Sequence, residues 1–145
     1  MRLLARQALP IVGGLFTLCV IIQVFLAGLG VFSDGGAFET HRQFGYLFGM
    51  LTLALLILAL IGREPRRVIG LSALLLALFA LQSVFVALRP TAPTVASLHP
   101  LNGFLILFVA ITLSRAAWAV RREAPIAAIT AAAPIAAGTP AEASR

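Results

Sequence analysis

Between Arg42 and Arg63 the chain reads QFGYLFGMLTLALLILALIG, a stretch without a single charged side chain. A helix needs about 20 predominantly apolar residues to cross the ~30 Å hydrocarbon core of a bilayer, and this stretch is long enough. Leu and Ala, both strong helix formers, dominate it, and the apolar residues do not alternate with polar ones as they would in a half-buried strand. The stretch therefore predicts a membrane-spanning helix.

Three further uncharged stretches resemble this one, and charged residues mark their ends. The predicted spans cover about residues 8–32, 38–61, 68–88 and 96–120. Short segments rich in Gly, Pro or Asp connect them at residues 33–36, 62–65 and 89–93. The sequence thus predicts an all-α membrane protein, an up-down bundle of four transmembrane helices within a domain of residues 1–122.

The composition excludes several other classes of protein. Hydrophobic residues make up 61% of the 145 residues and charged residues 11%, and the mean hydropathy is +1.04. Because a soluble domain carries about a quarter charged residues, a water-soluble fold is excluded and lipid is the expected solvent. Every basic residue is Arg, so no lysine is present for Schiff-base chemistry. A lone Cys19 excludes an intrachain disulfide and a thiolate metal cluster.

The arginines predict the orientation in the membrane. Basic residues near span ends mark the cytoplasmic side, where eight of them are expected: Arg2, Arg6, Arg63, Arg66, Arg67, Arg115, Arg121 and Arg122. Only Arg42 and Arg89 lie near the ends of spans on the other side. We therefore expect a multi-pass protein of a bacterial-type inner (plasma) membrane with both termini cytoplasmic. Although the net charge is +6, the arginines form no single patch, so nucleic acid is not an expected partner.

The segment 123–145 differs from the rest in composition. It is rich in Ala and Pro and has few large side chains. Such a sequence lacks the apolar surface needed for a core or a span. We expect a disordered cytoplasmic tail.

An internal repeat relates the two halves of the predicted bundle. Residues 41–47 read HRQFGYL and residues 99–105 read HPLNGFL, and both fit the pattern H-x-x-x-G-[YF]-L. Upstream, Gln23 in the first span corresponds to Gln82 in the third. Two tandem two-helix units would share one orientation and be related by an axis along the membrane normal. His41 and His99, the only two histidines, should then face each other near the outer surface.

Two facing imidazoles suggest a b-type haem. Histidines on opposite helices of a bundle are suitable axial ligands, so His41 and His99 are the predicted iron ligands. Gly45 and Gly103 each follow a histidine by four residues, which places them on the same helix face, where a flat macrocycle must approach the backbone.

Two arginines are candidates for the haem propionates. Arg42 and Arg89 are the predicted outer-side cations, and guanidinium groups suit carboxylates. Solvated charges at the ends of spans are an equally good reading of both residues.

The His41-Arg42 pair, His99 and the duplicated layout resemble one four-helix half of haem A synthase. They are also similar to small four-span bacterial membrane proteins of unknown function. The resemblance covers about residues 8–120 and implies haem binding, and pairing of two chains as a homodimer would imitate the double bundle of the synthase. Haem A synthase has a Glu about one turn before its His-Arg pair, whereas Glu39 lies two residues before His41. This departure gives oxygenation chemistry no support.

Two functions remain open from the sequence. The first is a haem protein that transfers single electrons, with a quinone or a periplasmic redox protein as partner, or that handles haem. The second is a cofactor-free structural or accessory membrane subunit, in which Gln23 and Gln82 hydrogen-bond each other across the bundle and Gly49 is a packing contact. A transporter is disfavoured because no ionisable side chain lies in the middle of a span. No catalytic set can be assembled either, so an enzyme is the less favoured reading, and only a haem-dependent oxidoreductase would fit.

Overall fold

The computed structural model describes the backbone of residues 1–132 and the side chains of residues 1–123. Four long helices, α1 (Arg2–Phe32), α2 (Ala37–Gly62), α3 (Arg66–Ala87) and α5 (His99–Ala132), are joined by short turns and by the one-turn helix α4 (Pro93–Ala96). The described residues contain no strand, which confirms the all-α prediction.

Four segments are long and apolar enough to cross a membrane, namely Arg2–Phe32, Ala37–Gly62, Arg66–Ala87 and Pro93–Glu123. They correspond one to one with the predicted spans. Large apolar side chains point outward along them, with Leu47 73% and Phe108 69% exposed. Such a continuous apolar surface is suited to lipid and not to water. The protein is therefore a multi-pass membrane protein in contact with the bilayer.

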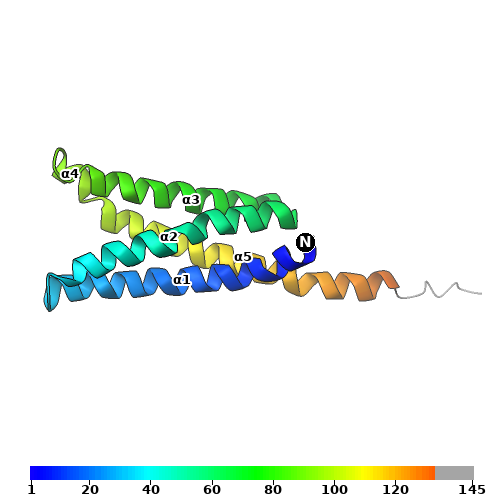
Figure 1. The fold of residues 1–145 in the computed structure, drawn as a ribbon. Helices are drawn as coiled ribbons and strands as arrows, with labels where there is room; N and C mark the ends of the chain where they lie inside the picture. The colour runs from blue at the N-terminus through cyan, green and yellow to red at the C-terminus, as the bar shows by residue number, and fades with distance from the viewer. Residues whose placement is uncertain (133–145) are drawn as a thin grey trace, which may run out of the picture.

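The helices run up, down, up and down, as predicted (Figure 1). The main contacts join α1 to α2, α2 to α3, α3 to α5 and α5 to α1. This order makes α1 and α3 one diagonal of the bundle and α2 and α5 the other. The α1–α2 turn and α4 lie at one end, called here the histidine end, and the α2–α3 turn lies at the other, called here the arginine end (Figure 1).

Aromatic rings fill the centre of the bundle. Phe16 of α1 is fully buried, and its ring centroid lies 5.4 Å from that of Phe48 on α2 and 6.1 Å from that of Phe79 on α3. The Phe48 and Phe79 centroids are 5.5 Å apart in an edge-to-face arrangement, which is a preferred geometry for pairs of aromatic rings. The Phe79 ring lies against Gly49, where an added Cβ would overlap it. Gly49 is therefore a packing contact, as predicted.

A salt bridge joins α1 to the α2–α3 turn at the arginine end. Arg6 near the start of α1 donates from Nε to Glu64 Oε1 at 3.2 Å, and the Glu64 side chain is only 3% exposed. Arg2 donates from Nε to the Gly62 carbonyl, also at 3.2 Å. Arg63 ends α2 in the left-handed region with φ of 51°, which reverses the chain within a short turn.

The structure differs from the sequence-based prediction at both ends of the chain. Helix α1 extends beyond the predicted span to Arg2, where Arg2 is hydrogen-bonded to the Gly62 carbonyl at the end of α2. Helix α5 continues to Ala132, past Arg122, where we predicted the disordered tail to begin. Alanine is the strongest helix former, and it dominates this extension. The rest of the predicted tail, residues 133–145, lies outside the described residues.

Candidate functional site

The two histidines lie next to each other at the histidine end of the bundle. His41 sits in the first two turns of α2, and His99 is the first residue of α5. Their ring centroids are 6.1 Å apart, and the ring planes are inclined by 58°. Residues on the α2–α5 diagonal therefore meet where the repeat predicted that they would.

The bonding of His41 fixes its tautomer. Its Nδ1 lies 3.0 Å from the backbone carbonyl of Gln23 on α1. Because a carbonyl oxygen only accepts hydrogen bonds, Nδ1 must carry the proton in this bond. In a neutral ring the lone pair is then on Nε2, as in a metal-ligating histidine whose other nitrogen is bonded to a carbonyl.

Each glutamine bonds to the histidine of its own hairpin. Gln23 donates from Nε2 to the His41 carbonyl at 2.7 Å, and Gln82 donates from Nε2 to the His99 carbonyl at 3.0 Å. The predicted bond between the two glutamines was wrong. They lie on α1 and α3, which form a diagonal of the bundle, so each reaches its neighbouring helix first.

Asn102 is a site residue that the sequence reasoning missed. It is buried on α5 and donates from Nδ2 to Gln82 Oε1 at 2.6 Å and to the Leu78 carbonyl at 2.9 Å. Phe44 occupies the corresponding position of the first repeat, so the two halves of the site differ. A polar residue one turn after a repeated histidine was the available signal.

A cavity of about 790 Å³ opens beside the two imidazoles. This volume falls in the range of about 300–1,000 Å³ that is usual for small-molecule sites. Apolar side chains such as Val20, Phe48 and Phe104 form much of the wall. All six residues predicted for the site line it: His41, His99, Gly45, Gly103, Arg42 and Arg89.

The two glycines differ in the space that surrounds them. A Cβ added at Gly45 would lie 2.8 Å from Gln23 Nε2, which is too close for an ordinary contact. At Gly103 the corresponding distance to Gln82 Nε2 is 3.6 Å, an ordinary contact. A methyl group at Gly45 would therefore displace the end of the Gln23 side chain, whereas Gly103 has space for a methyl group.

The two arginines differ in their surroundings. Arg42 pairs with Glu39 one turn earlier on α2, with Nη2 2.6 Å from Oε1 and Nε 2.9 Å from Oε2. The same carboxylate accepts a bond from Gln43 Nε2 at 2.8 Å. Arg89 lies at the cavity without a carboxylate partner among the described residues. Of the two, Arg89 is the cation available to an anionic group in the cavity.

The arrangement fits a metal held between two imidazoles. A metal–imidazole bond is about 2 Å long, so ring centres on opposite sides of one metal lie roughly 6 Å apart. The centroids of His41 and His99 are 6.1 Å apart. In addition, the buried atoms Gln23 Oε1 and His99 Nδ1 have no hydrogen-bond partner, and such atoms normally find one. The described residues hold no cluster of three or more metal-ligating side chains.

Comparison with known proteins gives a family match for part of the chain. Neither the curated proteins nor the solved structures contain a match to the chain. The matched region runs from Gln23 to Arg89, so it includes His41 and the whole of α2 and α3 and stops before His99. Over residues 23–89 the chain is similar to DUF6220, described as a family of unknown function.

Proposed function

We propose that the protein binds one b-type haem through His41 and His99 and uses it to transfer single electrons or to handle haem. The observation that carries this proposal is the 6.1 Å separation of the two imidazole centroids beside a cavity of about 790 Å³. When bound, a bis-imidazole haem supplies one-electron chemistry and leaves no open iron position for a gas.

Different residues of the chain would orient the two histidines, line the cavity and bind a haem propionate. The Gln23 carbonyl orients His41 with Nε2 free, and Asn102 fixes Gln82, whose amide holds the backbone of His99. The largely apolar wall of the cavity would contact the apolar part of the haem. Arg89 faces the cavity as a cation and suits a propionate, whereas Arg42 is engaged with Glu39.

The proposal includes a duplicated origin of the bundle. The same bond, from a glutamine amide to a histidine carbonyl, joins Gln23 to His41 and Gln82 to His99. Together with the repeated H-x-x-x-G motif, this supports two tandem two-helix units. It also agrees with the resemblance to one half of haem A synthase, which stays a prediction from the sequence. Two chains paired as a homodimer would then form a double bundle.

The redox partner and the membrane follow from the same proposal. The cavity lies at the end of the bundle that carries few arginines. With the arginine-rich end and both termini in the cytoplasm, the site would face the outside of a bacterial-type inner membrane. A quinone in the membrane or a periplasmic redox protein would reach it there.

A cofactor-free structural or accessory subunit is the second candidate. It is favoured by the contacts that already explain part of the site, because Gly45 accommodates Gln23 and Arg42 pairs with Glu39. In this case the histidines would be ordinary polar residues at the end of the bundle.

Visible spectroscopy separates the two candidates. Full-length protein is purified in detergent from cells supplied with a haem precursor, and the reduced-minus-oxidised spectrum and a pyridine haemochrome assay are recorded. We expect sharp α and β bands and about one haem per chain. His41→Ala and His99→Ala should each lose most of the pigment, whereas Tyr46→Phe, which changes the same cavity wall without removing a ligand, should keep it.

A colourless wild-type protein would favour the accessory subunit. Normal pigment content in both histidine variants would overturn the assignment of the ligands. Circular dichroism of each variant shows whether lost pigment reflects a lost ligand or a lost fold.

A further inference from the structure

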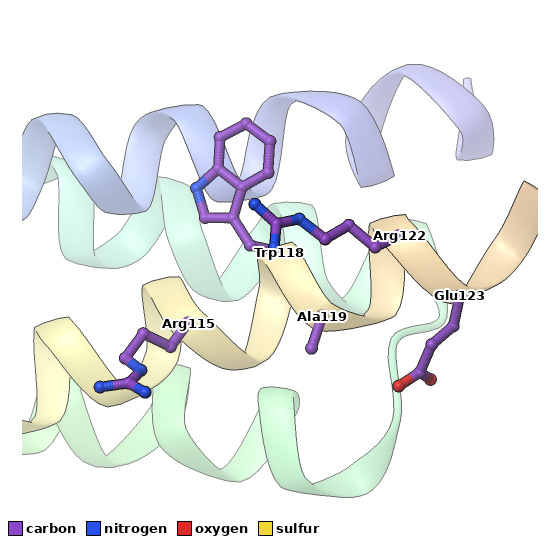
Figure 2. A pocket seen from close by; sticks show the side chains of 5 residues that line it. All are labelled: Arg115, Trp118, Ala119, Arg122 and Glu123. Atoms are coloured by element: carbon purple, nitrogen blue, oxygen red, sulfur yellow. The ribbon is translucent and has the colours of Figure 1, made fainter.

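The hollows at the two ends of the bundle differ in how far helices enclose them. At the arginine end the lining residues are Arg115, Trp118, Ala119, Arg122 and Glu123, all on α5, and the two guanidinium groups point to different sides (Figure 2). This hollow forms no enclosed site. The cavity beside the histidines is lined by residues of α1, α2, α3, α4 and α5. A ligand is therefore expected in the cavity at the histidine end.

This cavity reaches the surface of the bundle between α1 and α5. Val24 of α1 and Phe104 of α5 both line it and are 50% and 62% exposed, so they lie at its edge. Thr17, seven residues before Val24 and on the same face of α1, contacts Ser114 of α5 at 3.3 Å. Pro100, one turn before Phe104, also lines the cavity. Val24, Pro100 and Phe104 are called here the α1–α5 mouth.

A second mouth lies between α2 and α3. Arg42, Tyr46 and Ser83 line the cavity there, and all three are exposed. Gly49, seven residues after Arg42 and on the same face of α2, lies against the Phe79 ring of α3. Ser83 follows Phe79 by one turn. Arg42, Tyr46 and Ser83 are called here the α2–α3 mouth.

The two mouths occupy corresponding positions of the repeated sequence but differ in polarity. The corresponding residues are Val24 and Ser83, Pro100 and Arg42, and Phe104 and Tyr46. In every pair the side chain at the α1–α5 mouth is apolar and the side chain at the α2–α3 mouth carries a hydroxyl group or a charge. The α1–α5 mouth therefore favours a ligand with an apolar surface.

The α1–α5 mouth lies at the level of the lipid chains. Val24 is eight residues from the end of α1 at Phe32, which is roughly 12 Å along the helix. Val31, about two turns nearer to the end of the bundle, is still apolar and is 65% exposed. Such exposed apolar side chains are suited to contact with lipid. A molecule that enters through this mouth therefore comes from the bilayer and not from water.

Polar atoms without regular hydrogen bonds lie on the same two helices. Gln23 Oε1 on α1 and His99 Nδ1 on α5 are buried and lack such a bond. The corresponding atoms of the other helix pair are bonded, Gln82 Oε1 to Asn102 Nδ2 and His41 Nδ1 to a backbone carbonyl. Because an amide oxygen only accepts hydrogen bonds, Gln23 Oε1 requires a donor, and a ligand hydroxyl group supplies one.

We propose that the α1–α5 mouth binds a lipid-soluble quinol, with its ring against Phe104 and Val24, one ring hydroxyl donating to Gln23 Oε1 and its apolar tail in the bilayer. Aromatic rings pack favourably against one another, and the cavity wall is rich in phenylalanine. A quinol at this mouth is the lipid-soluble partner of the haem protein proposed above. Its redox role rests on that proposed function, whereas its binding does not require haem.

Photo-cross-linking measures the binding directly. Full-length protein in detergent is incubated without oxygen with decylhydroquinone that carries a diazirine on the first carbon of its tail, irradiated and analysed by peptide mass spectrometry. We expect cross-links on α1 and α5 near Val24 and Phe104. Unlabelled decylhydroquinone should compete at least fivefold better than its dimethyl ether, which has no hydroxyl donor, because one hydrogen bond contributes about a fivefold difference in affinity.

Matched variants distinguish the α1–α5 mouth from the rest of the apolar surface. Val24→Trp fills this mouth, and Ser83→Trp places the same ring at the corresponding position of the α2–α3 mouth. Both positions are exposed, so the bundle should fold with either substitution. We expect Val24→Trp to lower cross-linking at least fivefold and Ser83→Trp to lower it less than twofold. Val24→Phe and Ser83→Phe give the same comparison if a tryptophan variant fails to fold.

The haem content of the same samples, measured by the pyridine haemochrome assay, tests the two proposals separately. A colourless protein with the expected cross-links and competition would reject haem binding and support the quinol site. Whatever the pigment content, equal competition by the dimethyl ether would reject a quinol in favour of any apolar molecule. Equal losses in the two tryptophan variants, or cross-links confined to α2 and α3, would reject the α1–α5 mouth as the site.

Discussion

At the scale of single residues, the two histidines are held differently. His41 Nδ1 is hydrogen-bonded to the Gln23 carbonyl, whereas the buried His99 Nδ1 lies near the Gln82 backbone without a hydrogen bond of regular geometry. A ring without such a bond can rotate more easily about its side-chain torsions. His99 is thus the more adjustable of the two imidazoles.

The sequence predicted the meeting of the histidines but not the bonds that hold them. The repeated motif predicted that His41 and His99 lie at equal heights and face each other, on the assumption that the two halves are related by an axis along the membrane normal. The partners of Gln23 and Gln82 depend on which helices are neighbours and which are diagonal, and an apolar sequence does not specify this. Asn102 was missed because its partner Gln82 lies twenty residues away on another helix.

Gly49 provides a test of the packing at the centre of the bundle. Replacing it by alanine places a methyl group into the Phe79 ring, which is itself packed against Phe16 and Phe48. Overfilling a packed core costs about 1–3 kcal/mol. We expect Gly49→Ala to lower the midpoint of thermal unfolding in detergent, measured by circular dichroism.

Gly14 is the matched control for this substitution. It lies in α1 and has no atom within 4 Å of an added Cβ. Gly14→Ala should leave the unfolding midpoint unchanged or raise it, since alanine is the better helix former. Equal midpoints for the two variants would argue against the close contact between Gly49 and Phe79.

At the scale of helices, the predicted spans and turns agree with the structure in number and order. Uncharged length decides whether a segment crosses the bilayer, and that property is visible in one sequence. The ends were less accessible to prediction. The first turn of α1 depends on bonds from Arg2 and Arg6 to the α2–α3 turn, and these partners are sixty or so positions away in the chain.

The Arg6–Glu64 pair should couple α1 to the α2–α3 turn energetically. Arg6→Met leaves the Glu64 carboxylate, only 3% exposed, without its cation. Removing one partner of a buried ion pair lowers the free energy of unfolding by about 3–5 kcal/mol. Because Arg6 is partly exposed, the loss for this pair should lie near or below the lower end of that range. We expect a loss of roughly 2–3 kcal/mol in the free energy of unfolding. Denaturation in mixed detergent micelles, followed by circular dichroism, measures it.

A double-mutant cycle supplies the control. In Arg6→Met with Glu64→Gln no buried charge remains, so this variant should be more stable than Arg6→Met alone. Additive effects of the two substitutions would show that the pair contributes no coupling energy, contrary to our expectation.

At the scale of the whole molecule, the two ends of the bundle should lie on opposite sides of the membrane. Asp34 and Thr91 belong to the connections at the histidine end, whereas Arg67 lies at the arginine end. In a Cys19→Ser background, Asp34→Cys and Thr91→Cys should react with a membrane-impermeant maleimide in intact cells, and Arg67→Cys should react only after lysis. This outcome follows from the excess of arginines on the cytoplasmic side.

The reverse pattern would invert our orientation while keeping four spans. Reaction of Asp34→Cys on one side and Thr91→Cys on the other would contradict the up-down arrangement itself. Lysed cells, in which all three variants should react, show that each thiol is accessible to the reagent.

The hydrogen bonds at the histidine end have a consequence for biogenesis. Gln23 is hydrogen-bonded to His41 within α1–α2, and Gln82 is hydrogen-bonded to His99 and Asn102 within α3–α5. Between these hairpins the bundle relies on apolar contacts, among them the Phe16–Phe79 and Phe48–Phe79 pairs, and on Thr17 with Ser114 at 3.3 Å. Each hairpin can thus form these hydrogen bonds before the two hairpins dock by lateral diffusion in the membrane. His41 and His99 become neighbours only when the two hairpins dock, so a chain whose hairpins have not docked would lack the complete site.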